Sequence, residues 1–322
     1  MSDDDLGKND DPGKYDDLGK NDNLGKDDDF AVLRGLRATR PQAIAEAAAR
    51  RIRRPLLADP ADRLMLVAAD HPARGALGVR GDGGAMADRY ELLRRLRTAL
   101  RRPGVDGVLG TADVLEDLLL LGELDDKIAI GSMNRGGLQG AVFELDDRFT
   151  GYDAAAVARM RFDGGKMLVR IDPDDPASVR TLEACARAVD ELAAHGLLAM
   201  VEPFLSTRGS SGSVVNDLST AAVARSVAIA AGLGGTSAYT WLKLPVVEEM
   251  EAVMAATTMP ALLLGGDPSG SPEETYASWG RALAVPGVRG LMVGRALLYP
   301  PDGDVAAAVD SAVRLVRTGV AA

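Results

Sequence analysis

Short apolar runs alternate with longer amphipathic segments along most of this chain. Eight runs are almost entirely apolar, as expected for strands that are covered on both faces. Regular alternation of such strands with helices predicts a parallel sheet. The runs span residues 64–69, 105–109, 128–133, 167–171, 197–201, 240–244, 261–264 and 290–293.

The segments between these runs have helical spacing. Eight strand–helix units after residue 30 predict a (β/α)8 barrel. A doubly wound open sheet is the alternative, but no strand is followed by Gly-x-Gly-x-x-Gly, and Gly232-Leu233-Gly234-Gly235 follows a helix as a cap or turn. The third unit is irregular, with a long Gly-rich loop at 134–151. Helices are expected at 31–54 with a break near Pro41, and at 153–161, 176–194, 216–231, 246–256, 272–284 and 304–317.

The N-terminal segment has a different composition. Residues 1–29 contain eleven Asp and four Lys, with Gly-Lys pairs repeating every six residues. Too few apolar groups are present to offset the entropy of ordering, so we expect a disordered, solvated tail before a single barrel domain at 30–322. A calcium site is disfavoured because no Glu stands where a calcium loop would close.

Charge and composition narrow the choice of partners. The net charge is −10, but the tail carries −7 of it, so the other 293 residues carry only −3. An acidic chain with 4% aromatic residues disfavours nucleic acid as a partner. No apolar run reaches 18 residues, and the N-terminus lacks a signal-peptide pattern, so no membrane partner is expected.

The cysteine and histidine content disfavours a metal or disulfide role. The one cysteine, Cys185, falls in the middle of a predicted helix, where it is expected to pack in the core, and it suits a reducing cytoplasm. His195 precedes strand 5 and belongs at the opposite end of the barrel from His71. A single histidine near the site is a weak ligand set for a catalytic metal. We therefore expect no metal and no cofactor.

Polar residues at the carboxyl ends of barrel strands are candidates for chemistry. Asp70 follows the first strand, Glu202 ends the fifth and Lys243 stands near the end of the sixth, while Lys166 begins the fourth. Seven lysines stand against thirty arginines, and four of the lysines lie in the tail. A lysine retained inside an apolar strand suggests a role that an arginine cannot fill, because a guanidinium stays protonated and is not a nucleophile.

Lys243 is therefore the expected nucleophile. Burial lowers the pKa of a lysine, and a second ammonium nearby lowers it further, so a neutral amine can attack a carbonyl and form a Schiff base. The structural alternative is a lysine whose stem packs in the wall while its head reaches water. Lys127 opens the third strand at the opposite end and is expected on the surface.

Two carboxylates are expected to assist. Glu202 could transfer protons during dehydration and C–C cleavage, with its pKa raised by apolar surroundings, or it could form an ion pair with Lys166 or an arginine. Asp70 could orient the amine or bind a substrate hydroxyl. Each carboxylate therefore has a catalytic and a purely structural interpretation.

Glycine turns after strands 7 and 8 suggest a phosphate site. Gly265-Gly266 and Gly294 allow backbone N–H groups to approach an anion, and Arg295 could add a charge-assisted pair. The carboxylate of Asp267 is an objection to this site unless it faces away. A second anionic group could meet other loop arginines, but each is expected to be a surface cation: Arg74, Arg135 and Arg208.

These residues together resemble the class I, Schiff-base aldolases of the (β/α)8 superfamily, especially the tagatose-bisphosphate and archaeal-type fructose-bisphosphate aldolases. The resemblance covers about residues 60–318 and extends to a branch of actinobacterial barrel proteins associated with inositol catabolism. The long loop at 134–151, Asp267 and the tail depart from the pattern. The matching pieces are Ala69-Asp70, Lys166-Met167-Leu168-Val169, Val201-Glu202-Pro203, Trp241-Leu242-Lys243-Leu244-Pro245-Val246 and Met292-Val293-Gly294-Arg295-Ala296.

The resemblance implies a cytoplasmic aldehyde-lyase with Lys243 as the Schiff-base residue, Glu202 and Asp70 as acid/base or orienting groups, and Lys166 as a substrate-binding or pKa-tuning residue. Gly265, Gly266, Gly294 and Arg295 would hold a phosphate. The expected substrate is a small phosphorylated ketose or keto-acid, and a homo-oligomer is expected by analogy. Two alternatives stay open: a sugar-phosphate isomerase or epimerase with Glu202 as base, and a phospho-sugar-binding regulator without turnover.

Overall fold

The computed structural model describes residues 27–209, 212–266 and 270–318, so the tail predicted at 1–29 lies largely outside the described residues. Helix α1 (Asp27–Thr39) already begins at residue 27, inside the segment assigned to the tail. Helix α2 (Ala43–Arg50) follows after a turn at Pro41, where the break was predicted, but the chain leaves helical structure at Arg51 rather than at residue 54.

Eight parallel strands form a closed barrel. Strand β1 pairs with both β2 and β9, and β4 pairs with β5, which closes the ring without an open edge between them. The predicted (β/α)8 barrel is confirmed, and the open doubly wound sheet is excluded. The strands are β1 (Leu64–Ala68), β2 (Gly107–Gly110), β3 (Ile128–Ser132), β4 (Gly164–Ile171), β5 (Leu198–Arg208), β7 (Thr240–Leu244), β8 (Ala261–Leu264) and β9 (Val288–Val293).

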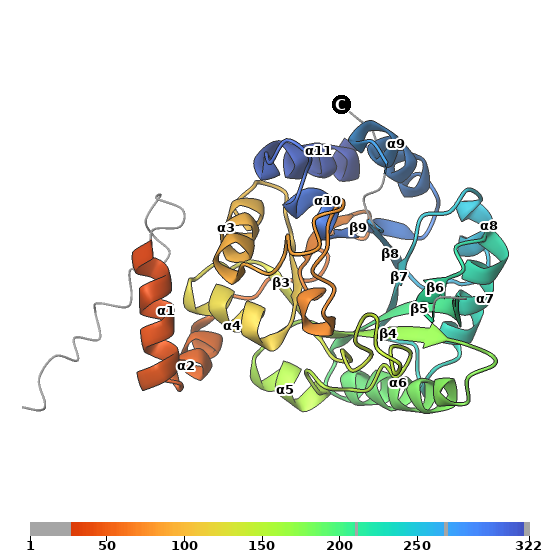
Figure 1. Ribbon diagram of the computed structural model, residues 1–322, viewed down its shortest axis with the longest axis horizontal. Coiled ribbons are helices and arrows are strands. Elements are labelled where there is room, and N and C mark those ends of the chain that lie inside the picture. Colours follow the sequence, from red (N-terminus) through yellow and green to blue (C-terminus); the bar gives the residue numbers. More distant parts are fainter. Residues whose placement is uncertain (1–26, 210–211, 267–269, 319–322) are drawn as a thin grey trace, which may run out of the picture.

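Helices surround the ring of strands, while α1 and α2 lie to one side of it (Figure 1). Polar side chains cap several of them: the Asp88 carboxylate accepts from two backbone N–H groups at the start of α3, and Ser271 and Glu274 form a capping box on α9. The other elements are η2 (Pro72–Arg74), α3 (Arg89–Leu100), α4 (Ala112–Leu120), α5 (Ala154–Arg159), α6 (Ala177–Ala194), α7 (Thr220–Ala231), α8 (Met250–Met254), α9 (Pro272–Leu283), α10 (Arg295–Leu298) and α11 (Val305–Thr318).

Two apolar cores explain why the strands read as continuous hydrophobic runs. One fills the barrel interior and includes Leu66, Ile130 and Met200, and the other lies between the barrel and its helices. Successive side chains of a strand point to opposite faces, so a strand between two cores needs apolar residues at every position. Cys185 of α6 is buried in the outer core, as predicted.

The fifth strand differs from the prediction. It was expected to end at Val201, but β5 continues to Arg208 and pairs there with a short antiparallel strand, β6 (Val214–Asn216). Pairing with β7 stops at Val201, so the missing N–H of Pro203 falls beyond that ladder and costs it no hydrogen bond. Glu202 therefore sits within β5 rather than at its end. Lys166 is likewise the third residue of β4, not the first.

Charged side chains form ion pairs at the amino-terminal ends of the barrel strands. Arg97 of α3 is fully buried and pairs with Glu123 and with Asp29 of α1, which ties α1 to the barrel. Lys127 is half-buried rather than on the surface, because its ammonium donates to the Val105 carbonyl at 2.7 Å.

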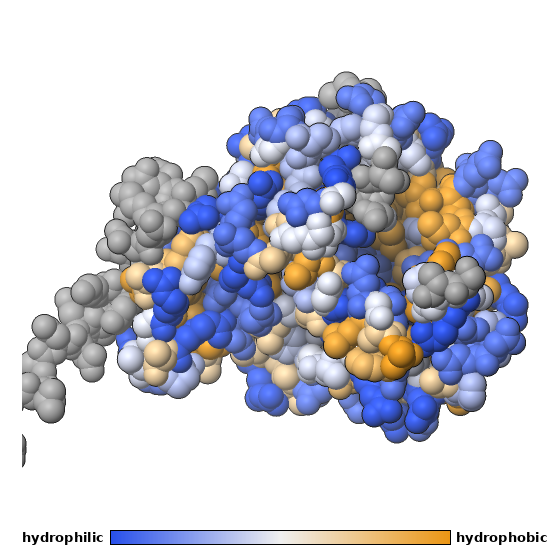
Figure 2. All heavy atoms as spheres, in the orientation of Figure 1, coloured by the Kyte–Doolittle hydropathy of each residue, from blue (hydrophilic) through white to orange (hydrophobic). Residues whose placement is uncertain are grey.

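The face in Figure 2 is largely hydrophilic, with a few groups of hydrophobic residues near its centre. No helix among the described residues is long and apolar enough to cross a membrane.

Candidate active site

A cavity of about 820 Å³ opens at the carboxyl ends of the barrel strands. Residues from seven strands (β1, β4, β5, β6, β7, β8 and β9) and from the turns after β8 and β9 line it. All eight site residues predicted from the sequence line this cavity: Asp70, Lys166, Glu202, Lys243, Gly265, Gly266, Gly294 and Arg295.

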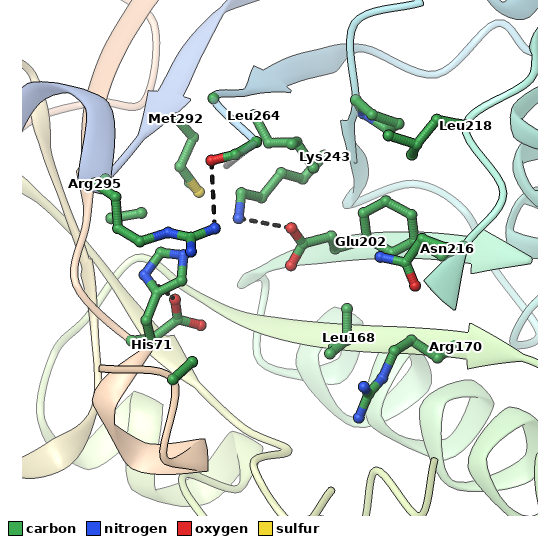
Figure 3. Close-up of a pocket in the computed structure, with 18 of the residues that line it drawn as sticks. His71, Leu168, Arg170, Glu202, Asn216, Leu218, Lys243, Leu264, Met292 and Arg295 are labelled. Carbon is green, nitrogen blue, oxygen red and sulfur yellow. Dashed lines mark hydrogen bonds and ion pairs between the residues drawn. The ribbon is translucent and has the colours of Figure 1, made fainter. Parts of the chain in front are cut away.

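One carboxylate lies between two lysines at the centre of the cavity. The ammonium of Lys243 on β7 donates to Oε1 of Glu202 at 2.8 Å, and Figure 3 shows the two side chains pointing toward each other. The ammonium of Lys166 on β4 pairs with Oε2 of the same carboxylate. All three side chains are at most 10% exposed. The strands thus hold two amines against one acid, with little exposure of any of the three side chains to solvent.

The pKa of Glu202 is opposite to the sequence expectation. Burial raises the pKa of a carboxyl group, but the ammonium groups of Lys166 and Lys243 outweigh burial and lower this pKa to about 2. The prediction of a raised pKa was therefore wrong, because it counted the apolar strand and not the two cations. Glu202 is an ionised partner of both amines at neutral pH.

A second buried carboxylate, Asp70, lies between three donors. It pairs with Arg135 at 2.9 Å and with Lys166 at 3.4 Å, and it accepts a hydrogen bond from the Ser132 hydroxyl at 3.1 Å. These cations hold its pKa well below the usual range against the opposing effect of burial. Lys166 bridges Asp70 to Glu202 and so links both acids into one network.

Arg135 is one of the site residues that sequence reasoning missed. It was expected to be a surface cation, but it is 7% exposed and lines the cavity. Its place after β3 was a usable signal, yet nothing in the sequence separates it from Arg74 and Arg208 in other loops. Arg208 is exposed, as expected, and donates to the Val142 carbonyl. Arg74 is only partly exposed and also lines the cavity.

Lys166 has an altered acidity. Burial lowers its pKa, the charge of Arg135 lowers it further, and the nearby carboxylates offset only part of this, leaving the pKa at about 8. A lysine with this pKa is a mixture of amine and ammonium at mildly alkaline pH. Lys166 is therefore both a charge partner and a group able to exchange a proton.

The predicted phosphate residues meet at one side of the cavity. Gly265 and Gly266 follow β8, Gly294 follows β9, and the Arg295 guanidinium donates to the Gly266 carbonyl at 3.4 Å, which joins the two turns. A Cβ on Gly294 would collide with the Ala68 carbonyl, so only glycine fits where β9 ends beside β1. Asp267, the predicted objection to this site, lies outside the described residues.

The long loop at 134–151 is fixed rather than open. Arg170 at the end of β4 donates to both carboxylate oxygens of Asp147 at 2.9 and 2.6 Å. The Asn134 side chain bonds to backbone groups of Leu168 and to the Asp147 carbonyl. These contacts hold Arg135, at the base of the loop, against Asp70.

Charge in the cavity favours an anionic ligand. Among the described lining residues, six cationic side chains face four carboxylates, although the whole chain carries −10. The cations are Arg74, Arg135, Lys166, Arg170, Lys243 and Arg295, and the carboxylates are Asp70, Glu144, Glu202 and Glu274.

Histidine contributes one side chain to the cavity. His71 lines it beside Asp70, whereas His195 is exposed at the C-terminal end of α6, away from the site as predicted. Within residues 27–209, 212–266 and 270–318, no group of three or more His, Cys, Asp or Glu side chains is arranged to hold a metal ion.

Comparison with known structures agrees with the barrel. The chain is 59% identical to Cgl0159 from Corynebacterium glutamicum, whose crystal structure aligns over 92% of this chain and 99% of that one with a TM-score of 0.88. A Schiff-base-forming fructose-1,6-bisphosphate aldolase is 21% identical, with a TM-score of 0.61 over 85% of this chain and 99% of that chain.

An archaeal fructose 1,6-bisphosphate aldolase is 19% identical, with the same TM-score of 0.61 over 85% of this chain and 98% of that chain. At these identities the aldolases show a shared fold. No curated protein matches the sequence. The Cgl0159-like family model matches residues 62–313, which is most of the chain. This protein therefore belongs to the Cgl0159-like family.

Proposed function

We propose that this protein is a cytoplasmic class I aldolase that cleaves or forms a C–C bond in a phosphorylated ketose or keto-acid through a Schiff base on Lys243. The observation that carries the proposal is the contact of 2.8 Å between the Lys243 ammonium and Glu202, with a second amine on the same acid. Such a pair keeps the nucleophile oriented in a buried pocket.

The reaction begins when the neutral amine of Lys243 attacks the substrate carbonyl. Loss of water from the carbinolamine gives an iminium: the Lys166 ammonium donates a proton to the leaving hydroxyl, and the Glu202 carboxylate stabilises the positive charge. The iminium accepts the electron pair of the breaking C–C bond, and the resulting enamine is protonated and hydrolysed. No further group is needed to supply the electron sink.

The excess of cations favours a phosphorylated substrate. Arg295 and the two glycine turns would hold the phosphate, because backbone N–H groups and a guanidinium both match phosphate oxygens. By resemblance to the aldolases, we expect dihydroxyacetone phosphate as a product. The association with inositol catabolism stays a prediction that rests on the resemblance alone.

The isomerase alternative needs Glu202 as a base. With its pKa at about 2, this carboxylate is a weak proton acceptor at neutral pH, which argues against that role. A phospho-sugar-binding regulator would use the same cations without turnover. It predicts thermal stabilisation by the ligand that survives Lys243→Met, with no product formed.

Borohydride reduction tests the proposal. Incubation with dihydroxyacetone phosphate and sodium borohydride should fix one ligand per chain, detected as a mass increase of the intact protein. Lys243→Met should abolish the adduct, because a thioether cannot form an imine. Lys127→Met is the matched control, since Lys127 lies at the other end of the barrel and its ammonium donates to the Val105 carbonyl, away from the cavity.

An adduct that persists in the Lys243→Met protein would place the nucleophile elsewhere. Deuterium uptake from solvent without any adduct would favour the isomerase. Failure of every keto-phosphate to give an adduct, while the protein still turns over substrate, would sink the aldolase proposal.

A further inference from the structure

The proposed cleavage needs a group that moves a proton at the substrate carbons. A base must take the proton of the hydroxyl on the carbon being released, and an acid must then protonate the enamine. Glu202 is held ionised by two ammonium groups, and the pKa of Asp70 is also well below its usual range. Both carboxylates are therefore held in ion pairs with buried cations, and neither carries a proton to donate.

Lys166 is engaged by both carboxylates, and His71 is a further titratable side chain among the described residues of the cavity wall. His71 lies between Asp70 and Arg295, and Figure 3 shows its ring next to the Arg295 guanidinium. Its side chain is 24% exposed, and its Nδ1 has no hydrogen-bond partner among the described residues. The ring thus lies in the cavity wall, but its Nδ1 takes no part in the hydrogen bonds that stabilise the site.

His71 lies close to Gly294, in the turn predicted to bind phosphate. A Cβ on Gly294 would lie 3.0 Å from Cε1 of His71, so the ring packs directly on that turn. The Oδ1 atom of Asp70 is 3.9 Å from Nδ1, near enough to stabilise a charged imidazolium. A substrate held by the turn and bonded to Lys243 would therefore present its intervening carbons to His71.

We propose that His71 is a catalytic residue that accepts the hydroxyl proton during C–C cleavage and returns it to the enamine carbon. This inference rests on the proposed Schiff-base function. A neutral imidazole suits the step, because one ring nitrogen accepts while the other can donate.

The step balances within the site. The imidazole takes the proton from the hydroxyl, the C–O bond becomes a carbonyl, the C–C bond breaks, and its electron pair forms the enamine with the iminium on Lys243. The imidazolium then donates the same proton to the enamine carbon, which restores the iminium and the neutral ring. Water releases the ketone, and no oxidant or reductant is required.

Substrate binding would prepare His71 for this step. Burial lowers its pKa to about 3; Asp70 raises it, while Arg295, Lys243 and Arg135 lower it. A bound phosphate would offset the Arg295 charge, and C–C cleavage would turn the positive iminium on Lys243 into a neutral enamine. The ring would therefore become a better base once substrate occupies the site.

Exchange of hydrogen into dihydroxyacetone phosphate tests His71 separately from Schiff-base formation. In deuterium oxide, the wild type should form a borohydride-reducible adduct and also exchange the hydrogen on the carbon next to the imine. His71→Gln and His71→Asn should keep the adduct, which also reports an intact fold, but lose exchange by roughly 100-fold or more. His195→Gln is the matched control and should leave both unchanged, because His195 is exposed at the end of α6.

The outcomes separate the two claims. Adduct with exchange within about twofold of wild type in both His71 variants would overturn the role of His71 and leave the Schiff base intact. Loss of the adduct in both variants, with the fold retained by circular dichroism, would overturn it too, since His71 would then act in imine formation or binding. Absence of an adduct in the wild type would overturn the proposed function and this inference together.

Discussion

At the scale of single residues, acidity depends on neighbours that the sequence does not place. The apolar strand around Glu202 predicted a raised pKa, but Lys166 and Lys243 come from strands 36 and 41 residues away in the chain and lower it. The sequence identified Lys243 as a residue of the cavity, because lysines are rare in this chain and this one lies in an apolar run. Arg135 was not, since its burial depends on the fold of a loop.

Acid should weaken the fold through Glu202. A carboxyl whose pKa is lowered in the folded state contributes stability that is present above its ordinary pKa of 4.5 and is lost as pH falls toward 2. The wild type should therefore be more stable than Glu202→Gln at pH 6, by roughly 3 kcal/mol, and the difference should shrink toward pH 2. Urea unfolding at several pH values measures it.

Exposed Glu248 offers the matched control, because Glu248→Gln should track the wild type throughout this range. A gap between wild type and Glu202→Gln that stays constant from pH 6 to pH 2 would contradict the ionised, doubly paired state of this acid.

The charge of Arg135 should be measurable at Lys166. Because Arg135 repels the ammonium form of Lys166, Arg135→Gln should raise the Lys166 pKa above its value of about 8. With seven lysines in the chain, NMR titration of labelled lysine side chains can resolve the change. Arg208→Gln, on the exposed hairpin, should leave the titration where it is, and an unchanged Lys166 in the Arg135→Gln protein would disprove this coupling.

At the scale of elements, the alternation of apolar runs and amphipathic segments predicted each barrel strand, because a strand between two cores leaves an unbroken apolar signature. The extension of β5 and its partner β6 left no such signature. They project beyond the barrel, where Val215 is exposed and the pattern is mixed. Elements outside the double core are therefore the ones that sequence periodicity misses.

The loop at 134–151 should depend on Arg170. A lysine keeps the charge but cannot bond both oxygens of Asp147 in the same plane, so Arg170→Lys should loosen the loop. Limited proteolysis should then cut within 134–151 several times faster than in the wild type. Arg187→Lys is the control, because Arg187 is exposed on α6 and pairs with Glu183 of the same helix. Equal cleavage rates in all three proteins would show that Arg170 does not hold the loop.

At the scale of the whole molecule, ring closure was predictable and its steric requirement was not. The count of eight strand–helix units implied a barrel, but the closing pair, β9 on β1, depends on a close approach that only coordinates reveal. A Cβ on Gly290, whose φ is +131°, would collide with the Leu64 carbonyl. The contact between β1 and β9, called the seam below, therefore tolerates only glycine at this position.

Replacing Gly290 should disrupt closure. Gly290→Ala should lower the free energy of unfolding by more than about 4 kcal/mol, because backbone strain and a backbone collision act at one residue. Gly35→Ala in α1 is the control: nothing lies near its Cβ, and alanine should stabilise that helix by about 0.5–1 kcal/mol. Equal thermal unfolding of Gly290→Ala and wild type would contradict the tight seam.

The Schiff base on Lys243 is tested most directly by a crystal structure of the protein reduced with borohydride in the presence of dihydroxyacetone phosphate. The proposed mechanism predicts continuous density from Nζ of Lys243 to the carbonyl-derived carbon of the ligand. The phosphate should lie between the Gly265–Gly266 turn and Gly294, against Arg295. A ligand bonded to Lys166, or a bound phosphate ester with no bond to Lys243, would contradict it.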